Sequence, residues 1–210
     1  MTIEVRGHVY VVDDNPDIRF YLSDLLRQMG YSIEEYADAA SFLSESLDIS
    51  PAVLVLDVRM PVMSGIELQD RLNALGRHTP IVFMSGESQS QEIIQAMKGG
   101  AIEFLWKPFQ IQALIDAIER GLALDRRRRD ELVLKNAIRR KLQELSTRER
   151  EVFALMLLGH TNKGISVQLD ILPDTVKKHR ANVLQKMQVQ QVADLIVMCK
   201  GLDIPALLES

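Results

Sequence analysis

Cysteine, aromatic residues and long apolar runs are scarce in this chain. Of its 210 residues one is a cysteine, Cys199, and aromatic residues make up 5%. A lone cysteine excludes an internal disulfide and suits the reducing cytoplasm. No run approaches the roughly 20 apolar residues of a membrane span, and the sequence begins with no basic and apolar leader. We therefore expect a cytoplasmic protein that has no membrane partner.

The phosphate-binding loop of many nucleotide-dependent enzymes, GxxxxGK[ST], is also missing, so phosphate is not expected to come from a bound nucleotide. What is present is a globular composition, 47% hydrophobic and 26% charged, in a length that suits two domains. The net charge of −4 hides a gradient: residues 1–124 carry 9 basic and 18 acidic residues, 125–141 carry 8 and 3, and 142–210 carry 8 and 8. This asymmetry predicts that the two halves of the chain have different functions, and nucleic-acid binding is not expected of the acidic half.

Short apolar runs alternate with helical patterns through the first half of the chain. Parallel strands joined by helical crossovers produce this alternation, so it predicts a doubly wound, flavodoxin-like α/β sheet with helices on both faces. The predicted strands are 8–12, 32–36, 52–56, 81–84 and 102–105, and the predicted helices are one after Pro16, 39–47, 64–75, 89–97 and one from Pro108.

Polar residues stand where these predicted strands end. Asp13 and Asp14 end the first strand, Asp57 the third, Ser85 the fourth and Lys107 the fifth. The carboxyl ends of parallel strands meet at one edge of the sheet, where ligands bind. Each acid alone reads as a helix N-cap, but three carboxylates gathered there repel one another by on the order of kcal/mol. A hard divalent cation, Mg²⁺ (or Mn²⁺), together with Lys107 relieves that repulsion.

This set of groups predicts phosphoryl transfer onto a carboxylate. Asp57 would attack and form an acyl phosphate, while Mg²⁺, Lys107 and the Ser85 hydroxyl neutralise the phosphoryl oxygens.

The second half of the chain predicts a linker helix followed by a small helical domain. An apolar helical rhythm runs from Ile111 to Leu145, and neither Pro nor Gly interrupts it after Leu122. Ser146 and Glu149 form a capping box that starts the next helix. Three further helices follow, at 162–169, 174–187 and 192–202, in a helix-turn-helix arrangement.

The helix at 174–187 has two chemically different faces. At about 100° per residue, Val176, Val183 and Met187 share an apolar side. The opposite side suits the major groove of DNA, with flanking basic residues for phosphates; it carries Lys177, Lys178, Arg180, Ala181, Asn182, Gln185 and Lys186. The run of arginines at 126–129 is a solvated helix face or, alternatively, a contact to DNA phosphate or to the acidic half.

Two sets of motifs resemble one known family. The acidic pair, the LDVRMP segment around Asp57, Ser85-Gly86 and Trp106-Lys107-Pro108 resemble the receiver domain of two-component response regulators. The segment from Leu145 to Val152 and the motif Thr175-Val176-Lys177 look like the output domain of the LuxR/FixJ/NarL class. The resemblance implies a receiver domain at 1–122, a helical linker at 123–141 and a LuxR-type DNA-binding domain at 142–210.

The resemblance also assigns roles to individual residues. It implies that a sensor histidine kinase phosphorylates Asp57, and that Ser85 and Phe104 form a switch. The backbone carbonyl of Arg59 would join Asp13, Asp14 and Asp57 in holding the metal. Gly164, Asp170 and Leu172 depart from the usual pattern; the Ser cap missing at Leu172 should cost about 1 kcal/mol.

The expected function is a response regulator rather than an enzyme. Phosphorylation would produce a homodimer that binds double-stranded promoter DNA and activates transcription, with RNA polymerase as a further partner. One rival is a DNA-binding regulator that works without phosphorylation. Another is a carboxylate-nucleophile phosphatase, which needs a second acid where Arg59 stands.

Overall fold

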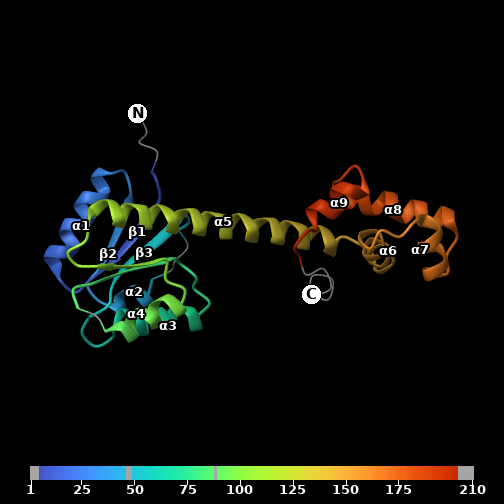
Figure 1. Cartoon of the computed structure of the whole chain (residues 1–210). Helices are drawn as coiled ribbons and strands as arrows, with labels where there is room; N and C mark the ends of the chain where they lie inside the picture. Colours follow the sequence, from blue (N-terminus) through green and yellow to red (C-terminus); the bar gives the residue numbers. More distant parts are fainter. Residues whose placement is uncertain (1–4, 46–48, 88, 203–210) are drawn as a thin grey trace. The chain divides into compact units, whose positions relative to one another are not determined.

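The chain folds into two compact units, which are described separately. The structure is a computed structural model that describes residues 5–45, 49–87 and 89–202. The units are Met1–Asp130 and Glu131–Ser210 (Figure 1). Across the described residues, no helix has the length and apolar character needed to cross a membrane.

The first unit contains the predicted five-stranded parallel sheet. Its strand order is β2-β1-β3-β4-β5 and every neighbouring pair is parallel. This order places β1 and β3 side by side at the centre, so their carboxyl ends lie next to each other. The strands are β1 (His8–Val12), β2 (Ser32–Tyr36), β3 (Ala52–Asp57), β4 (Ile81–Ser85) and β5 (Glu103–Trp106).

Helices cover both faces of this sheet, as predicted (Figure 1). The side chains of β3 point alternately to the two faces and all are buried, which explains why this strand is apolar throughout until Asp57. One face packs against α1 (Pro16–Gln28) and the first part of α5 (Ile111–Gln143). The other packs against α2 (Ala39–Leu43), α3 (Gly65–Ala74) and α4 (Ser90–Lys98).

Some element ends differ from the prediction. The helix predicted at 39–47 ends at Leu43, because the Arg77 guanidinium donates hydrogen bonds to the carbonyls of Leu43 and Glu45; residues 46 and 47 lie outside the described part. The helix predicted from Pro108 begins at Ile111. Asp57 and Ser85 are the last residues of their strands rather than the first residues after them, because the ladder pairs Asp57 with Met84 and Ser85 with Trp106.

A histidine is buried at the start of β1. His8 is 3% exposed; its Nδ1 lies 3.2 Å from Ser32 Oγ, its ring meets the Tyr10 ring edge-on, and its Nε2 lies 3.8 Å from a Glu34 carboxylate oxygen. Burial lowers the pKa of His8 below 6.5, and the Glu34 charge only partly opposes this effect. The folded state therefore favours the neutral imidazole.

This burial predicts that the first unit loses stability in mild acid. The stabilisation that comes from keeping the His8 imidazole neutral is complete above pH 6.5. It is lost as the pH falls from there through the lower pKa that His8 has in the folded state. We expect wild type to lose its stability advantage over His8→Gln across that range, since Gln does not titrate. Urea unfolding followed by the fluorescence of Trp106, the one tryptophan of the chain, measures the difference. A pH-independent difference between the two proteins would contradict the prediction.

The second unit is the predicted helical domain. Its helices are α6 (Thr147–Leu157), α7 (Asn162–Leu169), α8 (Pro173–Met187) and α9 (Val192–Met198). They enclose one apolar core, to which Ile138 and Leu142 of α5 also contribute. The capping box at Ser146 and Glu149 is confirmed, with both of its hydrogen bonds formed. The last helix ends at Met198 rather than Leu202.

The turn into α8 behaves as its unusual residues predict. Asp170 takes the left-handed conformation, with φ of 50°, which Asp tolerates better than most residues other than Gly. Leu172 occupies the N-cap of α8 and gives no side-chain hydrogen bond, while Pro173 fills the first helical position. The turn into α8 therefore forms without a polar side chain at the N-cap.

Gly164 predicts a stabilising substitution. It lies inside α7, and a Cβ built there would meet its nearest atom, His160 Nδ1, at 3.5 Å, an ordinary contact. Since Ala loses less backbone entropy than Gly in a helix, Gly164→Ala should stabilise the second unit by about 0.5–1 kcal/mol. Slower amide hydrogen exchange across α6 to α8 would report the gain; unchanged or faster exchange would contradict it.

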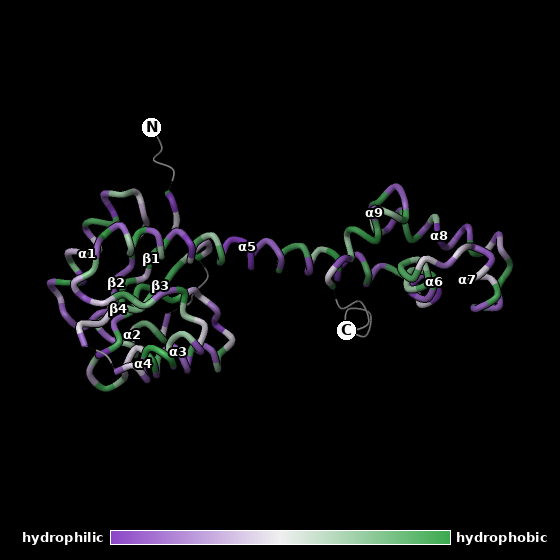
Figure 2. Tube along the Cα trace, viewed as in Figure 1, coloured by the Kyte–Doolittle hydropathy of each residue, from purple (hydrophilic) through white to green (hydrophobic). Residues whose placement is uncertain are grey.

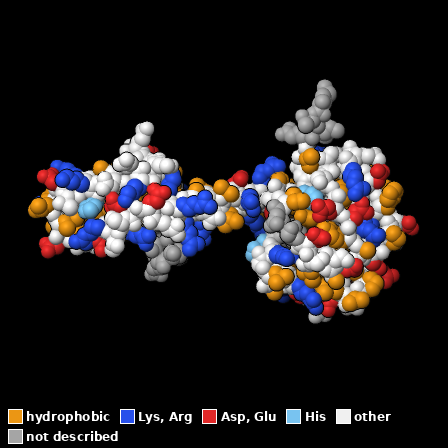
Figure 3. Space-filling model, turned by 180° about the vertical axis from the view of Figure 1, so that it is seen from behind, with side chains coloured by type: hydrophobic (Ala, Val, Ile, Leu, Met, Phe, Trp, Pro, Cys, Tyr) orange, Lys and Arg blue, Asp and Glu red, His pale blue; other side chains and the backbone are white. Residues whose placement is uncertain are grey.

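The middle of α5 is exposed, and the helix is continuous through it, as the absence of Pro and Gly predicts. Residues 126–137 have exposed side chains. Figure 2 shows this stretch as a hydrophilic segment followed by a short hydrophobic one, and Figure 3 shows Lys and Arg side chains gathered along it. Three hydrogen bonds join the residues around its start to the rest of the first unit: Asp125 accepts from Ser50 Oγ and Ala52 N, at 2.8 and 3.0 Å, and Arg128 donates to the His78 carbonyl at 2.9 Å.

Candidate functional site

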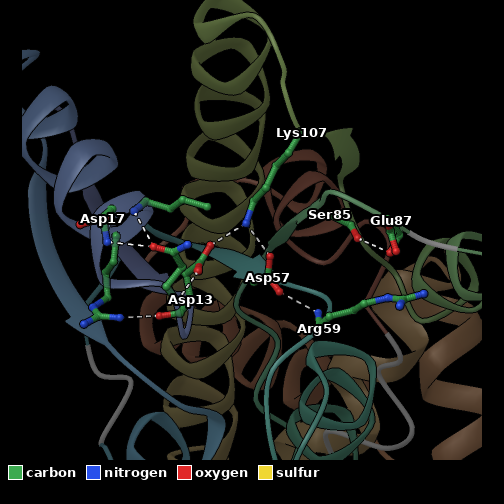
Figure 4. A network of polar contacts seen from close by, with 10 residues as sticks. Asp13, Asp17, Asp57, Arg59, Ser85, Glu87 and Lys107 are labelled. Carbon is green, nitrogen blue, oxygen red and sulfur yellow. Dashed lines mark hydrogen bonds and ion pairs between the residues drawn. The ribbon is translucent and has the colours of Figure 1, made fainter.

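The structure brings Asp13, Asp57 and Lys107 together at the carboxyl edge of the sheet. Lys107 Nζ lies 2.6 Å from Asp57 Oδ1 and 2.7 Å from Asp13 Oδ2. Figure 4 shows the two carboxylates meeting the ammonium group from different strands. Asp57 is the last residue of β3, and Asp13 and Lys107 directly follow β1 and β5, so the three side chains meet where the parallel strands end.

Asp57 is held in a mostly dry position. It is 6% exposed, and its second carboxylate oxygen accepts the backbone N–H of Arg59 at 2.7 Å. Burial raises the pKa of Asp57 above 3.8, and the negative charge of Asp13 adds to this effect; Lys107 and the Arg59 N–H oppose it without cancelling it. The positive charge of Lys107 alone therefore does not offset the cost of burying the ionised Asp57 carboxylate.

The pKa of Lys107 is raised as well, but by its charged partners rather than by burial. Burial alone would lower its pKa, but hydrogen bonds and charges from Asp13 and Asp57 outweigh burial and raise it. The side chain is therefore a permanent cation at neutral pH, shared between two buried acids.

The donor chemistry of this site fits a hard divalent cation. Asp13 is 1% exposed, so two buried carboxylates share a single positive charge. Carboxylate and carbonyl oxygens are the ligands that Mg²⁺ uses, and a further cation would supply the missing charge. The Asp14 side chain is exposed. Among the residues that the structure describes, no three acidic, His or Cys side chains already stand together as a metal-binding group.

Ser85 ends β4, the strand beside β3, and Phe104 lies on β5. The Ser85 hydroxyl donates to the backbone carbonyl of Glu87 at 2.8 Å, and Figure 4 shows it turned toward Glu87. Phe104 is half-buried, with its ring centre 6.2 Å from Phe83 and 5.6 Å from Trp106. Their role as a switch stays a prediction.

Local hydrogen bonds that the sequence did not reveal hold Asp13 in place. Its Oδ1 accepts the backbone N–H of Asn15 at 2.9 Å, and the Arg19 guanidinium donates to its backbone carbonyl at 2.6 Å. Neither Asn15 nor Arg19 carries a sequence signal for this role. α1 is thereby fastened to the carboxylate that contacts Lys107.

The candidate DNA-reading face lies on α8. Val176, Val183 and Met187 are fully buried, as the face analysis predicts. Lys177, Lys178, Ala181, Asn182 and Gln185 are exposed. Lys177 pairs with Asp174 at 3.0 Å, and Arg180 donates to the His160 carbonyl at 3.3 Å. Lys186 is paired with Glu149 at 2.6 Å and also donates to the Glu144 carbonyl, which leaves one N–H of its ammonium group for a phosphate.

Family models match both halves of the chain. Residues 9–119 match the model described as the response regulator receiver domain. Residues 143–199 match the model of bacterial regulatory proteins of the luxR family.

Curated relatives match across nearly the whole length. The transcriptional regulatory protein FixJ of Rhizobium meliloti is 38% identical over 190 residues, which cover 90% of this chain and 93% of that protein. The response regulator protein TodT of Pseudomonas putida is 37% identical over 188 residues, covering 90% and 83%.

Solved structures match as well. The response regulator StyR is 42% identical with a TM-score of 0.82, covering 92% of this chain and 98% of that one. Full-length FixJ from B. japonicum is 35% identical with a TM-score of 0.59, covering 93% and 97%. The chain therefore belongs to the two-component response regulators that join a receiver domain to a LuxR-type DNA-binding domain.

Proposed function

We propose that Asp57 accepts a phosphoryl group from a sensor histidine kinase and that this modification controls promoter binding by the second unit. The observation that carries the proposal is the buried Asp57 carboxylate, held against Lys107 beside Asp13. An ionised carboxylate fixed next to a permanent cation is a nucleophile paired with a group that can neutralise phosphoryl oxygens.

Each residue has a distinct part in this proposal. Asp13, Asp14, Asp57 and the Arg59 carbonyl would hold Mg²⁺ (or Mn²⁺), which supplies charge neutralisation when bound. The Asp57 carboxylate attacks the phosphorus of the kinase's phosphohistidine, the P–N bond breaks and the imidazole leaves, while Lys107 holds one phosphoryl oxygen. Ser85 would leave the Glu87 carbonyl and donate to another oxygen, with Phe104 moving inward behind it.

The second part of the proposal concerns DNA binding by the second unit. We propose that the phosphorylated chain dimerises and places two copies of α8 on two half-sites of double-stranded promoter DNA. Activation through contact with RNA polymerase would follow. The groups offered to bases and phosphates are Lys177, Lys178, Arg180, Ala181, Asn182, Gln185 and Lys186. We retain the boundaries 1–122, 123–141 and 142–210 for receiver, linker and DNA-binding domain as part of this proposal.

The proposal is tested by following DNA binding and oligomeric state together. Full-length protein is titrated onto promoter DNA by fluorescence anisotropy, with and without Mg²⁺ and beryllium fluoride, a phosphoryl mimic. We expect the mimic to tighten binding at least roughly tenfold, within the usual range of allosteric coupling, and sedimentation to show a monomer becoming a dimer. Equal affinity in both conditions would support the rival, a regulator that works without phosphorylation.

A further inference from the structure

The last turns of α5 are part of the second unit. This unit starts at Glu131, and Ile138 and Leu142 are each 1% exposed in the core that also contains Val183 and Met187 of α8. The end of α5 is therefore packed beside the candidate DNA-reading helix, although it precedes the helix-turn-helix in the sequence.

Lys141, on α5, reaches the C-terminal end of α8. Its Nζ donates to the backbone carbonyl of Met187, the last residue of that helix, at 3.2 Å. Lys186, in the last turn of α8, donates to the Glu144 carbonyl at 3.0 Å and pairs with Glu149 at 2.6 Å. Two ammonium groups thus lie at this end of α8, one from α5 and one from α8 itself.

The contact with Met187 does not use all the donors of Lys141. An ammonium group has three N–H donors. Within the part of the chain that the structure describes, the bond to Met187 is the one hydrogen bond of the Lys141 side chain. The residue is half-buried. Its ammonium group is therefore held in place while two N–H donors remain for an acceptor outside the protein.

The charge around Lys141 suits an anion. Residues 135–141 carry four cations, Lys135, Arg139, Arg140 and Lys141, and no acid. The C-terminal end of a helix carries a partial negative charge, which by itself repels anions. Because Glu149 offsets the charge of Lys186, Lys141 is the cation that reverses the sign of the charge at the end of α8.

The DNA backbone supplies an anion at this place. In helix-turn-helix proteins the N-terminal residues of the recognition helix contact the base edges. Met187 lies six residues beyond Ala181, which is about 9 Å at 1.5 Å per residue. This length exceeds half the width of the major groove, about 6 Å, and is close to its depth of about 8.5 Å. The last turn of α8 therefore comes to the rim of the groove, where the phosphates are.

We propose that Lys141 is a DNA phosphate contact supplied by the end of α5. Its ammonium group stays on the Met187 carbonyl and binds one backbone phosphate of each half-site. The inference rests on the proposed DNA-binding function and extends the DNA-contacting residues into the segment proposed as the linker, 123–141. Phosphate contacts carry no sequence information, so Lys141 contributes affinity and orientation rather than base preference.

The test measures how DNA affinity depends on salt. Wild-type full-length protein carrying Mg²⁺ and beryllium fluoride selects a duplex from random-sequence DNA, and fluorescence anisotropy then gives its affinity between about 50 and 300 mM salt. In a Lys141→Gln dimer each copy loses one phosphate contact, so the slope of log affinity against log salt should become shallower by about 1.8. Affinity near physiological salt should fall at least roughly tenfold. Lys141→Arg keeps the charge and should keep the wild-type slope.

Arg139→Gln is the matched control on the same helix. With 3.6 residues per turn, Arg139 lies about 160° from Lys141 around α5, and its side chain is exposed on the opposite flank. The same loss of charge should therefore leave the slope and the affinity of wild type unchanged. An equal change in slope for Arg139→Gln and Lys141→Gln would show that net charge alone matters, and would overturn the inference.

Neutral methylphosphonate linkages, placed singly along the duplex, locate the contact. At one phosphate of each half-site the neutral linkage should weaken binding of wild type but not of Lys141→Gln. If Lys141→Gln weakens binding without changing the slope, Lys141 only supports the fold and the inference is wrong. Unchanged DNA binding with a smaller dimer fraction in sedimentation would instead assign Lys141 to the acidic first unit of a second copy. A selection that enriches no sequence would overturn the proposed function, and the inference with it.

Discussion

Asp57→Asn should receive no phosphoryl group from a small phosphodonor such as acetyl phosphate. A neutral amide oxygen is too weak a nucleophile to attack phosphorus and displace acetate from the phosphodonor. Intact-protein mass spectrometry, before and after hydroxylamine, measures the labelled fraction.

A matched control distinguishes this effect from loss of one acidic residue. Asp24 is exposed on α1 and accepts a hydrogen bond from Gln28, away from Lys107. Asp24→Asn should be labelled as fully as wild type. Labelling of Asp57→Asn to the wild-type level would show that the phosphoryl group is carried elsewhere.

The same substitution should leave the fold intact and somewhat more stable. A carboxylate whose pKa is raised above 3.8 by burial is favoured in its neutral form by the folded state. Its charge therefore costs stability at neutral pH, and the cost disappears as the pH falls through the raised pKa. Asn is neutral at every pH, so Asp57→Asn should melt at a higher temperature than wild type near neutrality. A lower melting temperature would mean that the Lys107 ion pair contributes more than burial costs.

Much of the fold was predictable because local pattern and tertiary packing agree. β3 is buried on both faces, so its apolar run is unbroken, and Pro61 and Gly65 mark the turn that follows. The capping box at Ser146 was readable because both of its partners lie within four residues. Strand ends also placed Asp13, Asp57 and Lys107 correctly at one edge, because the carboxyl ends of parallel strands share that edge.

What was not predictable depends on contacts between segments far apart in the chain. The early end of α2 follows from Arg77, more than thirty residues away, whose guanidinium binds the carbonyls at the helix end. Glu149 was identified as a cap, but its ion pair with Lys186 forms only when α6 packs on α8. Lys186 likewise reads as a free cation from its helical position alone.

The site also depends on a glycine whose importance is visible only in the folded chain. Gly65 opens α3 directly under the end of β3, and its N–H donates to the Val58 carbonyl at 2.9 Å. A Cβ added there would lie 2.2 Å from the backbone oxygen of Asp57 and 3.1 Å from Leu56 Cγ. Neither neighbour can rotate away: one is backbone and the other belongs to a fully buried side chain.

Gly65→Ala should therefore destabilise the first unit by roughly 3 kcal/mol, at the upper end of the cost of overpacking a core. Because relief of the clash requires β3 or α3 to shift, the Asp57 carboxylate should also leave its position on Lys107, and labelling by acetyl phosphate should slow at least roughly tenfold. Urea unfolding followed by Trp106 fluorescence measures the first effect, and the rate of mass increase measures the second.

Gly86→Ala is the matched control in the same unit. No heavy atom of the described residues lies within 4 Å of a Cβ built at Gly86, and its backbone does not adopt a positive φ. The same chemical change should therefore alter the unfolding free energy by no more than about 0.5 kcal/mol. If Gly65→Ala were as stable as Gly86→Ala, the turn after β3 would have room for a methyl group. Close packing of α3 against the Asp57 backbone would then not be what fixes the carboxylate beside Lys107.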